Sequence, residues 1–446
     1  MVDKKLREAT EQLLLRNFAK ADDILNSLVP EELCSNDKIL FLCISGITEA
    51  IFRDRELGET KAGISRGLAK QSEDNELIGW AELSMGLILS YQGKENEAIL
   101  FYELARFSFE KGELFGLVAE TWLNIAEILL RQGDLKGGQL CIEEAKVFSE
   151  KSKDEKFKKF LDARIKLLKG VLFLESGALE HAIREISSSI EIFEDYKAKY
   201  FIFEAYSTAG SAYIRMNEYE KALKQLEKAL EIRLSKANDI NYALALLKII
   251  TLLIIKLKRT QFALPFLQEL DLLAKESERS VLKGINYHAK GIYELGQLNL
   301  YDAEKLFVKA INYYKDFSKI DYLYSLLLLA EVHISKFLIF SNDIDFEFAE
   351  RALNEVLEII GEHPLFELKI STLIAKSKLL LVKGDTEKAR KLISKALVIA
   401  EENNLQILKN LCLKEMEEIQ NPLATKGIRI DQALEYVREI ARNWQI

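Results

Sequence analysis

Proline and glycine are scarce in this sequence, with 4 prolines and 21 glycines among 446 residues. Average usage would supply roughly 22 and 31 of them. A β-sandwich or barrel of this length needs many turns rich in these two residues. Their scarcity therefore argues against the all-β classes and favours helices joined by short turns.

Cysteine and histidine are also rare, with 4 of each. The cysteines form no CxxC pair, and the histidines have no metal-ligand spacing. The chain also lacks GxxxxGK[ST] and GxGxxG, the motifs of phosphate-binding loops and dinucleotide sites. We therefore expect no disulfide framework, no metal or other cofactor, no enzymatic activity, and a reducing, cytoplasmic environment.

Basic residues are fewer than acidic ones, with 62 against 70, which gives a net charge of -8. This balance argues against a nucleic-acid or membrane-surface binder, which is usually basic. The longest apolar runs, 244–257 and 326–340, are broken by charged residues and fall short of the roughly 20 residues of a membrane span. We predict buried helices there and no membrane span, and the N-terminal residues lack the apolar core of a secretory signal.

The sequence does contain a repeated pattern. An alanine, once replaced by glycine, is usually followed by an aromatic or aliphatic residue four positions on and a small or aliphatic residue three positions later, as in Ala98, Tyr102 and Ala105. The pattern begins at 21, 62, 98, 138, 182, 222, 263, 303, 349 and 389. Another small residue usually lies twelve positions earlier, as at Gly86 and Gly210. A period of this length is the signature of a repeat architecture.

Short turns separate the two small positions within each period. The turn segments include GKEN at 93–96, GDLK at 133–136 and GDTE at 384–387. Glycine suits the C-terminal end of one helix, and the acidic residue after it suits the N-terminus of the next. Each period is therefore predicted to fold as a helix, a tight turn and a second helix.

This pattern resembles the tetratricopeptide repeat (TPR) family. Signature positions are matched by Trp122, Ala126, Leu129 and Ala145 in one unit and by Tyr206, Gly210, Tyr213, Ala222, Leu226 and Ala229 in another. The units are longer than the 34-residue TPR period. The resemblance implies an all-α fold, a TPR-like α-solenoid in which antiparallel helix pairs form a right-handed superhelix.

The repeat phase sets the predicted domain organisation. Residues 1–402 hold ten tandem TPR-like helix-turn-helix units, and 403–446 hold a degenerate eleventh unit with a C-terminal capping helix at 432–443. Such a cap shields the last apolar face of a solenoid.

The TPR resemblance also implies which residues bind a partner, because the first helix of each unit lines a concave groove in that family. Carried over by register, the candidates are Asn124, Glu127 and Arg131 in the fourth unit, Glu175 in the fifth, Thr208, Ser211 and Arg215 in the sixth, and Lys248 and Lys256 in the seventh. Arginine and lysine there suit a partner's carboxylates or backbone carbonyls. The alternative is that these are ordinary solvated charges or pair with one another.

Other groove positions in this register are apolar, among them Leu83, Leu167 and Leu252. Apolar groove positions favour an amphipathic helix or an extended apolar segment as the ligand. We therefore predict a protein-protein interaction scaffold or adaptor that binds a partner peptide or helix in the groove.

Two alternatives remain open at this point. One is a peptide-gated regulator resembling the Rap-type TPR proteins, in which a bound peptide changes the pitch of the superhelix. The other is an accessory subunit of an enzyme, or an enzyme whose catalytic groups lie among the abundant carboxylates. The sequence indicates a protein or peptide partner without indicating its identity or an oligomeric state.

Overall fold

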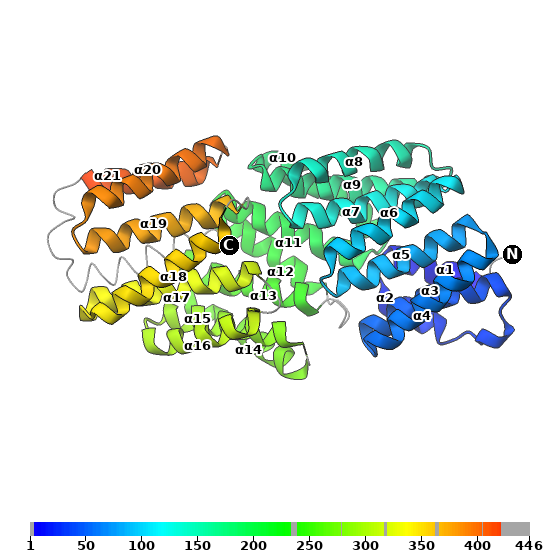
Figure 1. Ribbon diagram of the computed structural model, residues 1–446, viewed down its shortest axis with the longest axis horizontal. Helices are drawn as coiled ribbons and strands as arrows, with labels where there is room; N and C mark the ends of the chain where they lie inside the picture. Colours follow the sequence, from blue (N-terminus) through cyan, green and yellow to red (C-terminus); the bar gives the residue numbers. More distant parts are fainter. Residues whose placement is uncertain are drawn as a thin grey trace. The chain divides into compact units, whose positions relative to one another are not determined.

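The computed structural model describes residues 4–232, 239–277, 279–315, 319–361, 365–403 and 405–420. These residues form twenty-one α-helices and no strand, in consecutive helix pairs (Figure 1). The predicted all-α fold of TPR-like helix pairs is confirmed. The predicted capping helix at 432–443 lies outside the described residues.

The chain divides into two compact units, Met1–Ala209 with Glu231–Asn238, and Gly210–Leu230 with Asp239–Ile446. The first begins with α1 (Lys4–Leu14), α2 (Phe18–Leu25) and a short 3-10 helix η1 (Pro30–Glu32). Its later pairs are α3 (Ser35–Phe52) with α4 (Arg55–Ser72), α5 (Asn75–Tyr91) with α6 (Glu95–Lys111), α7 (Phe115–Arg131) with α8 (Leu135–Glu150), and α9 (Glu155–Glu175) with α10 (Leu179–Asp195).

Helices α11 (Lys199–Arg215) and α12 (Tyr219–Glu231) contain the border between the two units. The second unit continues with α13 (Asp239–Thr251), the π-helical turn η3 (Leu252–Lys256) and α14 (Thr260–Glu276). Its later pairs are α15 (Ser280–Gly296) with α16 (Leu300–Tyr314), α17 (Lys319–Phe340) with α18 (Asp343–Ile360), and α19 (Phe366–Val382) with α20 (Thr386–Glu402). The last described helix is α21 (Gln406–Gln420).

The first helices of successive pairs lie against one another, as α3 does with α5 and α7 with α9 in the first unit, and α17 with α19 in the second. We call each such row the first-helix layer of its unit. The core lies between this layer and the second helices. The nine anchor alanines of the repeat pattern have no exposed surface: Ala21, Ala62, Ala98, Ala182, Ala222, Ala263, Ala303, Ala349 and Ala389.

The tight turns follow the chemistry predicted from their glycines. Gly93 and Gly133 have φ angles of 75° and 81°, in the left-handed region that favours glycine. The amide after each donates to a carbonyl five residues back, from Lys94 to Leu89 at 3.0 Å and from Asp134 to Leu129 at 2.9 Å. The Asp134 carboxylate then caps the next helix, accepting from the Gly137 amide at 2.9 Å.

Close approach of the paired helices depends on the small residue of the first helix. A Cβ atom placed on Gly86 in α5 would lie 2.6 Å from the ring of Tyr102 in α6, which is 1 % exposed. The tyrosine ring therefore occupies the space that a side chain at 86 would need.

Helix α17 is long and apolar enough to cross a membrane by length and composition alone. Of its most apolar window, 67% is buried inside the structure. This burial is that of a core helix, in line with the buried helix predicted for 326–340.

His288 in α15 is one of the buried polar groups of the second unit. Its Nδ1 lies 2.7 Å from the Ser325 hydroxyl, and its ring packs edge-on against Phe307 and Tyr314. Burial lowers the pKa of His288 from 6.5 to about 4, so the ring is neutral at physiological pH.

We predict that Gly86→Ala lowers the stability by about 1–3 kcal/mol, because the new methyl group overpacks against Tyr102. Gly67→Ala in α4 is the matched control, since a Cβ there meets nothing within 4 Å. It should raise stability by up to about 1 kcal/mol through helix propensity. Urea unfolding followed by circular dichroism measures both, and equal effects of the two substitutions would contradict the packing argument.

A second prediction concerns acid stability. The pKa of His288 is lowered on folding, so its contribution is fully present above pH 6.5 and is lost as the pH falls through about 4. Between pH 7 and pH 4 the wild type should lose about 3 kcal/mol more stability than His288→Gln. Urea titrations of both proteins at the two pH values give this difference, and parallel losses would show that His288 does not contribute.

Candidate functional site

Helix α7 carries three of the predicted partner-binding residues on one face, with spacing i, i+3 and i+7. Asn124 is only 3 % exposed, whereas the side chain of Glu127 is 29 % exposed and that of Arg131 is 51 % exposed. The face therefore runs from a buried amide to a half-exposed guanidinium.

Asn124 accepts hydrogen bonds from two arginines that belong to other helix pairs. Its Oδ1 accepts a hydrogen bond from Arg16 Nη2 at 2.7 Å and one from Arg164 Nη2 at 3.3 Å. Arg16 lies in the turn between α1 and α2, and Arg164 lies in α9. Both arginines are buried.

The carboxylates of α7 complete the group. Arg164 pairs with Glu120 through a short contact and with Glu127 Oε2 at 3.4 Å, and its guanidinium lies 5.0 Å from the ring centre of Phe201. We name Arg16, Glu120, Asn124, Glu127 and Arg164 the inner polar cluster. Its two positive and two negative charges balance, which a buried group of charges requires.

Aromatic side chains surround the inner polar cluster. Phe18, at the start of α2, packs edge-on against Tyr91 with ring centres 5.2 Å apart. Burial raises the pKa of Tyr102 to about 12 and also raises the pKa values of Tyr91 and Tyr200. The three phenols therefore remain neutral at physiological pH and keep their hydroxyl donors.

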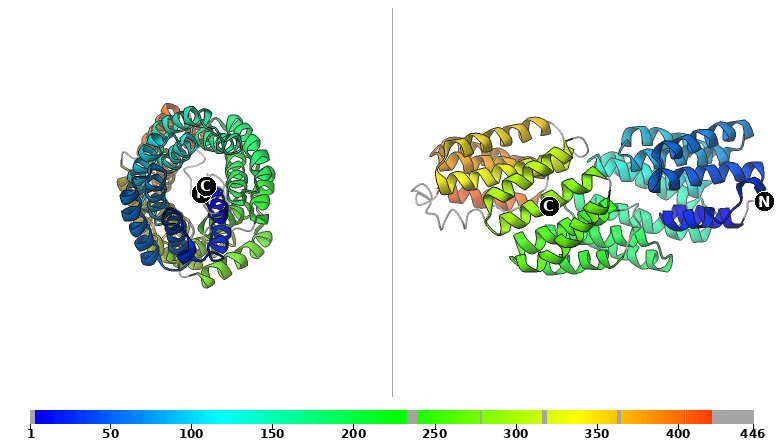
Figure 2. Two further views of the ribbon diagram at one scale, coloured as in Figure 1. Left: turned by 90° about the vertical axis from the view of Figure 1, so that its right-hand side faces the viewer. Right: turned by 90° about the horizontal axis from the view of Figure 1, so that it is seen from below.

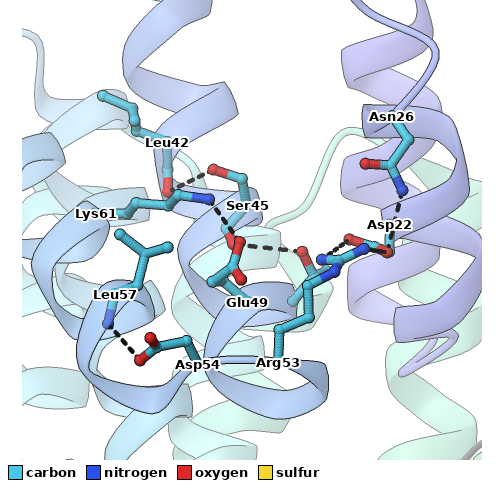
Figure 3. Close-up of polar contacts among 10 residues, drawn as sticks. Asp22, Asn26, Leu42, Ser45, Glu49, Arg53, Asp54, Leu57 and Lys61 are labelled. Carbon is cyan, nitrogen blue, oxygen red and sulfur yellow. Dashed lines mark hydrogen bonds and ion pairs between the residues drawn. The ribbon is translucent and has the colours of Figure 1, made fainter.

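An ion pair on the surface holds the α1–α2 pair to the next one. Arg53, at the end of α3, donates to both carboxylate oxygens of Asp22 in α2, at 3.0 and 2.5 Å, and Asn26 donates to the same carboxylate at 3.2 Å (Figure 3). Glu49 pairs in turn with Lys61 of α4 at 2.8 Å. Figure 2 shows α1 and α2, in dark blue, on the inner side of the helices that follow them in the first unit.

In the second unit, the predicted residues also meet side chains of other helix pairs. Lys248 Nζ donates to the Ser211 hydroxyl at 2.9 Å. Arg215 lies 3.5 Å from a carboxylate oxygen of Glu367 in α19. Burial lowers the pKa of Lys256 to about 7, and its ammonium lies 5.8 Å from the ring centre of Tyr219.

The remaining predicted residues lie elsewhere. The Thr208 hydroxyl donates to the Glu204 carbonyl of its own helix at 2.7 Å, so it is turned toward the backbone. Glu175 is exposed at the last residue of α9. Arg131 makes a loose surface pair with Glu95 at 3.6 Å, a kind of contact that contributes little to stability.

The predicted apolar lining of the groove needs correction. Leu83, Leu167 and Leu252 are 1 %, 6 % and 1 % exposed. The first helices pack against one another and against their second helices, and this packing covers these positions. The part-exposed groups on the first-helix layers are therefore more polar than the register suggested.

Three members of the inner polar cluster were not among the predicted site residues: Arg16, Glu120 and Arg164. For two of them the sequence held a signal, because Glu120 and Arg164 each lie six residues before the small residue of their first helix. They share one repeat position with opposite charges in successive units. Arg16 lies in a turn outside this register, so no periodic signal marked it.

The cluster contains no recognisable catalytic group, and among the described residues no set of three or more His, Cys, Asp or Glu could hold a metal ion. The segment 63–67 matches the GxSxG pattern of ester hydrolases. It lies inside helix α4, however, and the buried Ser65 hydroxyl donates to the Ala62 carbonyl at 2.8 Å. The exposed strand-to-helix turn that this motif requires is not formed there.

Comparison with known proteins adds to this description. A family model described as tetratricopeptide repeat matches residues 203–233. The apo form of the quorum sensor NprR from B. thuringiensis is similar in structure, with a TM-score of 0.57 and 18% identity over 80% of this chain and 98% of NprR. A comparison with curated protein sequences gives no significant match.

Two further solved structures are similar at lower scores. A Rap protein complexed with competence and sporulation factor has a TM-score of 0.47 and 12% identity, covering 94% of this chain and 98% of that one. A signal-transduction ATPase with a tetratricopeptide repeat sensor from Pyrococcus horikoshii has a TM-score of 0.48 and 16% identity, covering 88% and 66%.

The matched segment corresponds to α11 and α12, where the sequence pattern is among the strongest, and the similarity to NprR extends the fold over most of the described helices. Residues 203–233 therefore match a tetratricopeptide repeat, and the described helices have a TPR-like fold.

Proposed function

We propose that this protein is an interaction scaffold or adaptor that binds a peptide or helix of a partner protein along its first-helix layers. The observation that carries the proposal is that polar side chains of distant helix pairs meet on these layers. In the first unit Arg16 meets Asn124, and in the second unit Arg215 meets Glu367.

The contacts of these layers suit exchange with a partner. The Arg131 side chain is 51 % exposed and lies 3.6 Å from Glu95. An exposed pair of this kind contributes little to stability, so a partner carboxylate can replace it at small cost. The planar fork of arginine then binds that carboxylate through two hydrogen bonds.

The quorum sensor NprR, similar in fold, provides a precedent for signal recognition by this architecture. The four cysteines are free thiols, which suits the cytoplasmic setting that we propose. A peptide-gated regulator resembling the Rap-type proteins is the second candidate. The buried contact between the α1–α2 turn and α7 favours it, because a ligand that competed for this contact would move the first helix pair.

The scaffold proposal predicts that removing three basic groups of the first-helix layers abolishes capture of the partner. In the variant Arg131→Gln/Arg215→Gln/Lys248→Gln, affinity purification from the source cells should recover partner proteins at least ten-fold less efficiently. The matched control is Arg184→Gln/Lys224→Gln/Lys391→Gln, which removes the same charge from exposed positions on second helices.

Quantitative mass spectrometry of the captured proteins provides the comparison, and circular dichroism confirms that both variants keep their helicity. Proteins recovered equally by the wild type, the inner variant and the control would contradict binding on the first-helix layers.

The two candidate functions differ in the response to a captured partner peptide. Small-angle X-ray scattering of a scaffold should give the same radius of gyration with and without saturating peptide. A gated regulator should change its radius of gyration, because the ligand favours one of two conformations. An unchanged radius at saturation argues against gating.

A further inference from the structure

The turn between α1 and α2 places an arginine deep inside the first unit. Arg16 is 8 % exposed, and it bonds to a residue 108 positions further along the chain. In a repeat protein each unit mainly contacts its neighbours, yet this residue of the first helix pair reaches the fourth. The contact brings the α1–α2 turn onto the first-helix layer.

The surroundings of Arg16 form a receptor for a guanidinium group. Asn124 Oδ1 accepts from Arg16 at 2.7 Å, and the carboxylates of Glu120 and Glu127 supply negative charge beside it. Glu120 is 2 % exposed, and its Oε2 has no hydrogen-bond partner among the described residues. Arg164 pairs with both carboxylates and Arg131 interacts with Glu127, and Arg16 adds a further positive charge and the 2.7 Å hydrogen bond to Asn124.

The element that carries Arg16 is short. Helices α1 and α2 have 11 and 8 residues, whereas α3 and α4 have 18 each. Short helices depend on tertiary contacts for their stability, and elements with few such contacts open most easily. The α1–α2 pair therefore depends for its stability on its packing, on the Asp22–Arg53 ion pair and on the Arg16 contact.

A cleft adjoins the turn. It has a volume of about 530 Å³ and lies between the end of α1 and the segments that precede α7 and α9, with Leu14, Leu15, Phe115 and Phe157 in its lining. This size is in the range of ligand-binding pockets. Leu15, the residue before Arg16, lines this cleft, so the main chain of an incoming segment has room next to the turn.

We propose that the α1–α2 turn is an internal ligand: Arg16 occupies a guanidinium receptor formed by Glu120, Asn124 and Glu127, and an arginine-bearing segment of the partner replaces it. This inference rests on the proposed binding function and names its partner chemistry and regulation. Arginine fits this receptor because its guanidinium is always charged and presents several donors in one plane.

Chemical rescue tests the receptor directly. Arg16→Ala removes the side chain beyond Cβ, and ethylguanidinium replaces the missing atoms. At millimolar concentrations it should raise the melting temperature of Arg16→Ala by about 2–4 °C in a saturable manner. Ethylurea, its neutral isostere, should have no such effect.

Two variants serve as controls. Arg53→Ala removes an arginine whose side chain is 45% exposed in its pair with Asp22 (Figure 3), so ethylguanidinium should not rescue it. Arg16→Ala/Asn124→Leu should lose the rescue, because the acceptor is gone. No saturable rescue of Arg16→Ala, or equal rescue of Arg53→Ala, would overturn the receptor.

Displacement is measured in the wild type, which avoids any folding defect of the variant. A blocked Gly-Arg-Gly peptide should increase hydrogen exchange of the α1–α2 segment, and the same peptide with citrulline in place of arginine should not. The arginine peptide should also bind Arg16→Ala at least ten-fold more tightly than the wild type. Equal exchange with both peptides, or equal affinity for both proteins, would overturn the internal-ligand role.

These outcomes separate the inference from the proposed function. Rescue without any loss of partner capture in the Arg131→Gln/Arg215→Gln/Lys248→Gln variant would support the receptor and overturn the scaffold. Loss of capture without rescue would overturn the receptor and support the scaffold.

Discussion

The close approach of paired helices at small residues is the constraint on which the structure depends. The anchor alanines are fully buried, and Gly86 leaves just enough space for the ring of Tyr102. Where the helices of a pair approach in this way, the apolar side chains between them are buried. The same packing covers Leu83 and Leu252, which the repeat register had assigned to a groove.

The groups of the first-helix layers that a ligand can contact are consequently mainly polar. Some are exposed and loosely paired, as Arg131 is, and others form the buried inner polar cluster. A buried charge is tolerated only with a partner, so the Glu120–Arg164 pair and the Arg16 contact stabilise each other. The α1–α2 turn is thereby linked to the surface on which we expect a partner to bind.

Most of the fold could be predicted from the sequence, because helix pairs repeat a local pattern. The turn glycines, the buried alanines and the periodic spacing of apolar residues along each helix each determine structure within a few residues of sequence. The turn at Gly133 and Asp134 is an example. The site was only partly predictable. The repeat register placed Asn124, Glu127 and Arg131 on one face of a helix. It also assigned Glu120 and Arg164, which have opposite charges, to the same position of successive units. Arg16 follows no periodicity.

The sequence by itself determined the helical class and the TPR-like pairing of helices, since these depend on contacts between residues near one another in the chain. Only the tertiary structure decided which polar residues meet. Arg16 and Asn124 are 108 positions apart, and Arg215 and Glu367 belong to helix pairs far apart in the sequence. Such contacts depend on how successive pairs stack within a unit, and small rotations at each stacking step add up to a geometry that no single repeat encodes.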